Sequence, residues 1–274
     1  MDLWHVVILA VIQALTEFLP VSSSGHLALV GFFLGWPYQG LTFDLALHFG
    51  TLTAVLVYYR RDLWQILRAV LSRGQTTADV LHRRLGWGLV LATLPALAVG
   101  VAMSDAFAES LRVPMLIAVN LIVFGIVLGL ADHYGRKQRE VWSVRLFDAF
   151  VIGCAQVLAL IPGVSRSGIT MTAGLALGLS RQDAARYTFL MSVPITTAAC
   201  AHGLLTLLKA GEPVDVPAFL IGAVVAAIAG LGCIHFLLGF LRRAGMWPFV
   251  LYRIALGITV IAVLVLRGPP LIGA

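Results

Sequence analysis

The sequence predicts an all-α integral membrane protein. Of its 274 residues, 60% are hydrophobic and only 12% are charged, and the mean hydropathy is +0.96. A soluble domain averages about 45–50% apolar and about 25% charged residues, so this composition indicates several membrane spans. Two of the apolar regions are interrupted by similar polar motifs. We expect a single membrane domain, residues 1–274, and we exclude nucleic acid as a partner because the cations lie in short loops between apolar runs.

Six apolar runs are long enough to cross a bilayer, which takes about 20 helical residues. Two further regions, 6–35 and 147–179, could each hold two short helices and are broken centrally by proline, serine and glycine. Proline ends a helical ladder, and such a break at membrane depth requires cover from protein or a cavity. We predict two re-entrant helix–loop–helix hairpins, with two kinked spans as the alternative. The six predicted spans are residues 43–59, 86–104, 112–131, 186–208, 217–240 and 248–266.

The loop charges predict the orientation of the spans. Cations gather in loops 60–85 and 132–146, which should therefore be cytoplasmic. The assignment of loops to the two sides of the membrane is consistent only if each broken region returns to the side that it entered from. Three spans separate the hairpins, so the halves, about 1–131 and 132–274, form an inverted-topology repeat whose tips can meet near the midplane. The other loops fit the outside, and their acidic residues are Asp105, Glu109, Glu212 and Asp215.

The two polar motifs resemble each other. Residues 13–26 read QALTEFLPVSSSGH, and residues 156–170 read QVLALIPGVSRSGIT. Serine and glycine before an apolar run mark a helix start, where the first N–H groups lack partners and the dipole favours an anion. Two such starts facing each other would cradle phosphate groups, unless the serines only cap their own helices. The candidate diphosphate-binding residues are Ser22, Ser24, Ser165, Arg166, Ser167, Gly168 and Thr170.

Charged side chains lie in both motifs. Arg166 stands in the second one, although arginine at the bilayer centre costs about 2.5–3.5 kcal/mol. Its guanidinium could clamp phosphate oxygens, or it could form a structural ion pair with Glu17. Gln13 and Glu17 share one helix face, where they could hold a divalent cation, Mg²⁺ or Ca²⁺. A proton-carrying or salt-bridged Glu17 is the alternative.

His26 follows the serines of the first motif and should lie in the first turn of the outgoing helix. It could act as a general base, a leaving-group acid or a nucleophile, or it could be structural. Asp44 and His48, one turn apart, could line an entry path or simply cap and pair. Tyr252 and Arg253 are expected to anchor a membrane interface. Neither this pair nor Asp44 and His48 is assigned to the site.

The two motifs are similar to those of the undecaprenyl-diphosphatases of the bacitracin-resistance protein type. The resemblance covers essentially the whole chain and implies an enzyme of the bacterial inner membrane, with its active site facing the periplasm. It would hydrolyse undecaprenyl diphosphate to undecaprenyl phosphate and orthophosphate, recycling the lipid carrier for cell-wall synthesis. Divalent-metal dependence and bacitracin resistance on overproduction are also implied.

The resemblance implies roles by position. Glu17 would bind or orient the metal, and Ser23 or His26 would attack or transfer a proton. The family's first motif often begins with glutamate where Gln13 stands, and an amide oxygen lacks the carboxylate charge. The implied catalytic residues are Ser23, His26, Glu17 and Arg166.

Two rival functions are the alternatives to hydrolysis. A lipid-phosphate flippase could bind the same headgroup, since inverted repeats and broken helices are typical of transporters. A non-catalytic assembly subunit would leave Glu17, His26 and Arg166 unexplained. The candidate partners are the polyprenyl diphosphate, the membrane lipids and a second copy of the chain in a homodimer.

Overall fold

A computed structural model describes residues 2–72, 74, 76–103, 110–210 and 214–267. Within this part, secondary structure is helical except for one isolated bridge between Arg139 and Leu179. Six of the described helices are long and apolar enough to cross a membrane, and they confirm the six predicted runs. They are α3 (Leu41–Tyr58), α5 (Thr77–Ala102), α7 (Pro114–Tyr134), α10 (Arg181–Ala210), α11 (Val216–Phe240) and α12 (Trp247–Arg267).

The prediction of a loop at residues 60–85 is wrong, because most of this segment is helical. Helix α4 (Arg60–Ser72) follows α3 directly, and α5 begins nine residues before its predicted start. The Thr76 hydroxyl caps α5 by accepting the backbone N–H of Asp79 at 3.1 Å. α4 is amphipathic and buries Ile66 and Ala69. Amphipathic packing thus extends helices through a segment whose arginines suggested a loop. Residues 73 and 75 of that segment, and Asp105, Glu109 and Glu212, lie outside the described residues.

Each of the two broken regions contains two short helices that pack against each other, as predicted. The first region holds α1 (Leu3–Phe18) and α2 (Ser23–Leu34). The second holds α8 (Leu146–Val157), which continues into the 3₁₀ turn η2 (Leu158–Leu160), and then α9 (Arg166–Ala176). In both regions, therefore, the second helix starts within the serine-containing motif.

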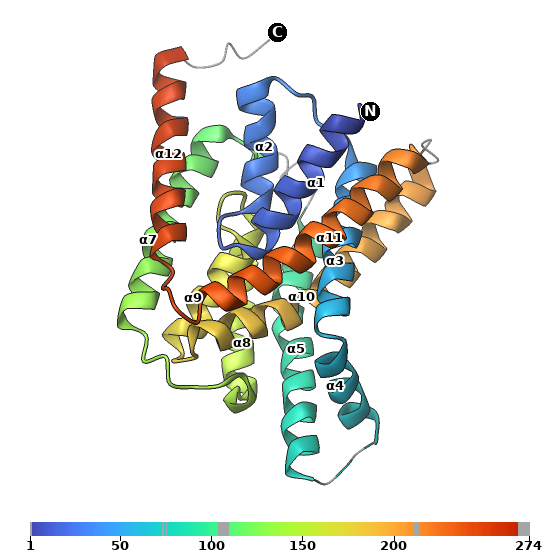
Figure 1. The fold of residues 1–274 in the computed structure, drawn as a ribbon, viewed down its shortest axis with the longest axis vertical. Coiled ribbons are helices and arrows are strands. Elements are labelled where there is room, and N and C mark those ends of the chain that lie inside the picture. Colours follow the sequence, from blue (N-terminus) through green and yellow to red (C-terminus); the bar gives the residue numbers. More distant parts are fainter. Residues whose placement is uncertain (1, 73, 75, 104–109, 211–213, 268–274) are drawn as a thin grey trace.

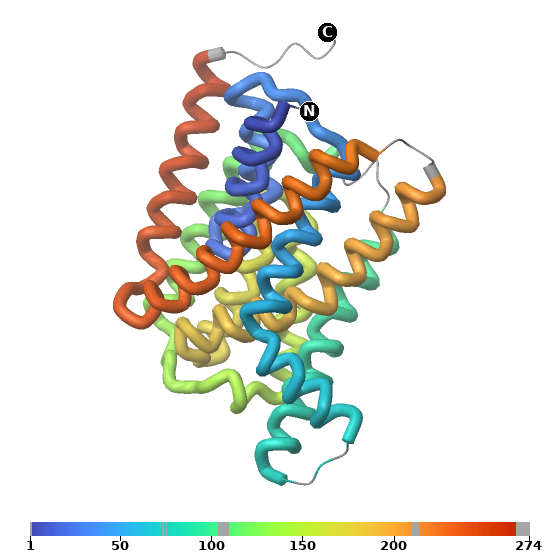
Figure 2. Tube along the Cα trace, turned by 45° about the vertical axis from the view of Figure 1, so that its right-hand side comes forward, coloured from blue at the N-terminus to red at the C-terminus, as the bar shows by residue number. Residues whose placement is uncertain are grey.

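The two helix pairs approach each other from opposite ends of the molecule (Figure 1). α1 and α2 descend from the end at which the chain begins, whereas α8 and α9 rise from the other end. Around them, α1 packs on α11, α9 packs on α7 and α10, and α3 pairs with α11. Figure 2 shows α12 ending on the same side as the start of α1. The loop of each pair is consequently surrounded by long helices.

Ion pairs connect helix ends on the side of the molecule that lies away from the start of α1. Asp132, near the end of α7, accepts from Arg181 at the start of α10. Asp148 of α8 accepts from Arg139, and the 3₁₀ helix η1 (Val141–Ser143) lies between those two residues in the chain. These are the same helix ends at which the sequence places most of its cations, so the charge pattern is matched by a compact polar layer.

Candidate active site

Both motifs begin their second helix in the same unusual way. Ser22 has φ 78° and Ser165 has φ 75°, a region that residues other than glycine rarely adopt. The Ser22 hydroxyl accepts the backbone N–H of Gly25 at 3.3 Å, and Ser165 accepts that of Gly168 at 3.1 Å. Such backbone strain costs about 1–3 kcal/mol and marks functional sites. The expectation that these serines cap helices is confirmed, and the matching geometry makes the two tips equivalent structures.

Hydrogen bonds join the two tips directly. The Ser167 hydroxyl of the second tip donates to the carbonyl of Leu19 in the first at 3.0 Å. Asn120 of α7 donates from its side chain to the carbonyl of Pro162 at 2.9 Å. Gly163 has φ 90°, and a Cβ there would lie 2.6 Å from the Ile117 carbonyl oxygen. The second tip therefore fits against α7 only with glycine at this position.

Arg253 of α12 is the main link between the tips. The prediction that it anchors a membrane interface is wrong. Its side chain is fully buried. The guanidinium donates to the carbonyl of Pro20 in the first tip at 3.1 Å, and to those of Gly163 and Val164 in the second at 2.9 and 3.0 Å. It also bonds two carbonyls of α7. The sequence contained a signal for this role, because an arginine inside an apolar run costs free energy unless its guanidinium is hydrogen-bonded.

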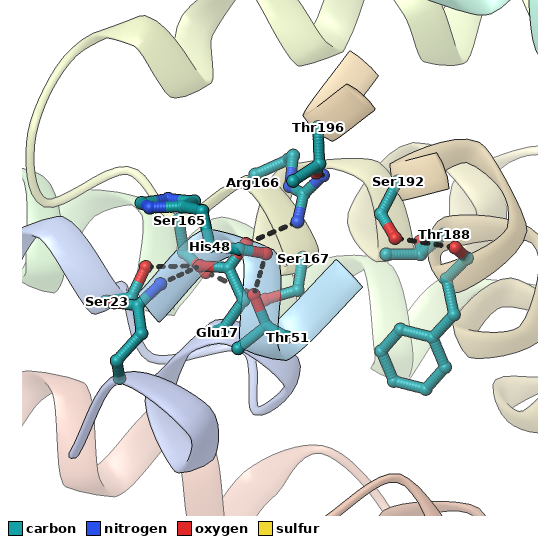
Figure 3. A network of polar contacts seen from close by, with 12 residues as sticks. Glu17, Ser23, His48, Thr51, Ser165, Arg166, Ser167, Thr188, Ser192 and Thr196 are labelled. Atoms are coloured by element: carbon teal, nitrogen blue, oxygen red, sulfur yellow. Dashed lines mark hydrogen bonds and ion pairs between the residues drawn. The ribbon is translucent and has the colours of Figure 1, made fainter. Parts of the chain in front are cut away.

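Glu17 lies at the centre of a polar network (Figure 3). One carboxylate oxygen forms an ion pair with Arg166, and the other accepts from the Ser23 hydroxyl at 2.6 Å. The Gln13 amide donates to the same oxygen at 3.3 Å, and Arg166 donates to the Thr196 hydroxyl at 2.9 Å. The two motifs are therefore brought together, and the Glu17–Arg166 ion pair, which was the alternative to a phosphate clamp, is present.

A cavity of about 220 Å³ is lined by Glu17 and by all of its partners in this network except Gln13. Besides the charged pair, it is lined by serines of both tips and by polar residues from three other helices. A second cavity, about 410 Å³, shares Ser23, Ser24 and His48 with the first and has a mainly apolar wall. A polar chamber thus adjoins an apolar one. The residues of the two tips that line the smaller cavity are Glu17, Ser22, Ser23, Ser24, Ser165, Arg166 and Ser167.

Four of the candidate site residues lie outside the lining of the smaller cavity. Gln13 lines the larger cavity instead. Gly168 gives its backbone N–H to Ser165, and the Thr170 hydroxyl lies 2.9 Å from that of Thr188 on α10. The His26 ring is placed between the Ser22 carbonyl at 2.7 Å and the Tyr252 hydroxyl at 2.7 Å. Because a carbonyl only accepts, Nδ1 of His26 carries a proton, and in the neutral ring Nε2 accepts from Tyr252.

Several polar residues at the cavities were not assigned from the sequence. His48 lines both chambers, and its Nδ1 donates to the Asp44 carbonyl at 2.8 Å. Gln156 and Thr196 line the smaller one. The position of Gln156 opposite Gln13 in the aligned motifs was a usable signal for its place in the site. Thr196 lies inside a long apolar span, where nothing local marks it.

A charged cluster lies at the larger cavity, near the connection between α2 and α3. Tyr38 donates to the Asp44 carboxylate at 2.8 Å, and Arg112 lies 5.4 Å above the Tyr38 ring. Partial desolvation of its hydroxyl at the cavity, together with the neighbouring Asp44 carboxylate, raises the pKa of Tyr38 to about 12, although the residue as a whole is 61% exposed. Tyr38 therefore remains a proton donor at neutral pH.

The donor set fits a divalent cation only if further ligands come from outside the chain. Among the described residues no group of three histidine, cysteine, aspartate or glutamate side chains could hold a metal. However, the Oε1 atoms of Gln13 and Gln156 are buried and lack hydrogen-bond partners. One carboxylate and neutral oxygens match the manner in which Mg²⁺ is bound, with phosphates and water completing the shell.

Comparison with known proteins identifies the chain's relatives. The family of the bacitracin resistance protein BacA matches residues 6–259. The chain belongs to this family. The undecaprenyl-diphosphatase of Trichlorobacter lovleyi is 48% identical over 96% of this chain and 98% of its own length. The proteins of the same name from Teredinibacter turnerae and Marinobacter nauticus are 46% and 45% identical, over 94% and 96% of this chain and 98% and 100% of theirs. Membership of the family and the six apolar helices make this a multi-pass membrane protein.

Proposed function

We propose that this protein is an undecaprenyl-diphosphatase of the bacterial inner membrane. It hydrolyses undecaprenyl diphosphate to undecaprenyl phosphate and orthophosphate, which recycles the lipid carrier for cell-wall synthesis. Relatives that align with this chain over nearly their whole length bear that name. The observation that carries the proposal is the convergence of two serine-capped helix starts on Glu17 and Arg166 in one cavity.

In this proposal, α1–α2 and α8–α9 are re-entrant hairpins of an inverted-topology repeat. Their approach from opposite ends and the matching serine caps support this arrangement. The cation-rich helix ends mark the cytoplasmic side. The larger cavity extends to residues 36–39, between α2 and α3, away from those ends. The active site accordingly faces the periplasm.

The geometry supports Ser23 as the attacking group and Glu17 as its base. The Ser23 hydroxyl already donates to Glu17, which is the arrangement of a nucleophile and its base. Ser23 Oγ attacks the terminal phosphorus, its proton passes to Glu17, and the bond to the bridging oxygen breaks, so undecaprenyl phosphate leaves. A water molecule then cleaves the phosphoserine and releases orthophosphate. His26 is less suited to attack because Tyr252 occupies its Nε2.

Arg166 and the helix starts bind the diphosphate. On substrate entry, the Arg166 guanidinium turns from the Glu17 carboxylate to phosphate oxygens, which frees that carboxylate to accept the Ser23 proton. The free N–H groups at the starts of α2 and α9 add donors. A divalent cation, held by Glu17 and Gln13, would supply further neutralisation of phosphate charge. The hydroxyls of Ser22, Ser24, Ser165 and Ser167 line the same space.

The larger cavity suits the lipid end of the substrate. Its wall includes Leu27, Val30 and Phe43, and it meets the polar chamber at Ser23 and Ser24. A diphosphate in the polar chamber therefore leaves the first isoprene units beside an apolar wall. The rest of the chain can extend among the helices.

The test is orthophosphate release from undecaprenyl diphosphate by the purified protein, with and without a chelator. We expect release by the parent, and a loss of at least about 100-fold for Ser23→Ala and for Arg166→Ala, as for other groups acting in the transition state. Ser143→Ala, outside the cavities, is the matched control. A protein that binds the lipid and releases no orthophosphate would instead be a flippase, and near-parental release by Ser23→Ala would refute the nucleophile.

A further inference from the structure

Helix α4 carries an uncovered apolar stripe. Trp64, Leu67 and Leu71 are 66%, 49% and 73% exposed. At about 100° per residue, these three positions lie within an arc of about 60° on one face. The opposite face, with Ile66 and Ala69, is buried against α5. The packing there is close, since a Cβ on Gly86 of α5 would lie 2.8 Å from side-chain atoms of Ile66. The stripe is therefore held facing outward.

Exposed arginines flank the stripe. Arg60, Arg61 and Arg68 are exposed, and none has a carboxylate oxygen within 4.0 Å among the residues that the structure describes. The one acidic residue of α4, Asp62, is engaged by Arg186 at 2.8 Å. This face of the helix thus combines three exposed positive charges with three large apolar side chains.

The first turn of α4 lies at a membrane boundary. α3 has 18 residues, about 27 Å of helix, which is close to the thickness of a hydrocarbon core. α4 starts immediately after it, and the α4–α5 pair extends beyond the other helices (Figures 1 and 2). If α4 stood upright, Leu71 would lie about 16 Å past its first residue. That is beyond the headgroup zone, about 5–8 Å deep, so reaching the acyl chains requires the α4–α5 pair to lean onto the membrane.

We propose that α4 is a docking surface for anionic phospholipid headgroups of the adjacent leaflet. The apolar stripe enters the boundary between headgroups and acyl chains, and the three arginines bind lipid phosphates. An amphipathic helix with arginines beside tryptophan and leucine binds in this way, and the charge complementarity selects anionic over zwitterionic lipids. The surface lies on α4, and no residue of α4 lines either cavity of the proposed site, so this inference stands apart from the proposed enzymatic function.

The experiment uses the full-length protein in nanodiscs of phosphatidylcholine containing a fixed fraction of phosphatidylglycerol. Bromine is placed on the acyl chains of one lipid or the other. The fluorescence difference between the parent and Trp64→Phe isolates Trp64. We expect brominated phosphatidylglycerol to quench Trp64 more strongly than brominated phosphatidylcholine at equal mole fraction, and the preference to fall as salt rises.

Two double variants with equal loss of charge test the surface. Arg61→Gln/Arg68→Gln should lower the phosphatidylglycerol preference by about an order of magnitude. Arg242→Gln/Arg243→Gln, at exposed positions between α11 and α12, should retain it. The proposal is overturned if the parent shows no preference or if both variants lose it equally. Quenching of Trp64 that appears only on self-association would identify a second copy as the occupant and would overturn it as well. If the first variant does not fold, the salt dependence of the parent still decides.

Discussion

Arg253 should be the residue whose loss most disturbs the meeting of the two tips. In Arg253→Met, the apolar bulk of the side chain remains and every donor disappears. Two of the five acceptors belong to α7 and retain helical partners. The loop carbonyls of Pro20, Gly163 and Val164 lose their guanidinium donor. The change therefore acts on both tips at once.

The magnitude follows from these three carbonyls. A buried acceptor without a donor costs about 1–3 kcal/mol, which gives about 3–9 kcal/mol. Removing a guanidinium from the membrane interior returns about 2.5–3.5 kcal/mol. The net destabilisation should be about 3 kcal/mol. At about 2–4 °C per kcal/mol for a chain of this size, the melting temperature should fall by roughly 6–12 °C.

Thermal unfolding in detergent measures this effect, and orthophosphate release measures its consequence for the site. Arg242→Met, at an exposed position, is the matched control and should change stability by less than about 0.5 kcal/mol. An Arg253→Met protein that melts within about 1 °C of the parent and releases orthophosphate at the parental rate would refute the reasoning. The carbonyls would then have found other donors.

Three further changes test other parts of the site. Gly163→Ala should destabilise the protein by at least about 2 kcal/mol, because φ is positive and the Cβ would meet a backbone oxygen. Its control is Gly239→Ala, in open space on α11, which should be neutral or stabilising. Thermal unfolding measures both, and equal melting temperatures for the two variants would contradict this prediction. Gln13→Glu should lower the Mg²⁺ concentration that half-activates orthophosphate release, since carboxylate binds hard cations more strongly than amide; an unchanged titration would argue against Gln13 as a ligand. Tyr252→Phe removes one hydrogen bond, about 1 kcal/mol, so the rate should fall by no more than about fivefold, and a larger loss with a shifted pH profile would give His26 a direct role.

Local patterns in the sequence were sufficient to predict the six spanning helices and the polar centre. Apolar runs of spanning length predict helices because the bilayer leaves the backbone no other partners. Ser22 and Ser165 mark helix starts because a serine oxygen accepts a free N–H. The α4 segment was missed for the converse reason. Its arginines suggested a loop, although Ile66 and Ala69 at helical spacing bury one face against α5.

Contacts between distant segments could not be predicted from the sequence. Arg253 reaches carbonyls of segments that lie 90 and 233 residues away in the chain. The His26 ring direction is set by Tyr252, which lies 226 residues away. The spacing of His26 after the serines fixes its helical turn, but the face on which a ring points depends on which helix packs there. Tertiary partners therefore decided both roles.

The equivalence of the two tips explains how the proposed nucleophile and clamp come to face each other. Ser23 is the first residue of α2, Arg166 is the first residue of α9, and the two align in the motifs. Each contacts a different oxygen of the same Glu17 carboxylate. Two equivalent loops that approach from opposite ends place equivalent residues on either side of a shared centre. An arginine at one of the two positions and a serine at the other then place a cation and a hydroxyl around one carboxylate, which supplies the proposed hydrolysis with both a phosphate clamp and a nucleophile.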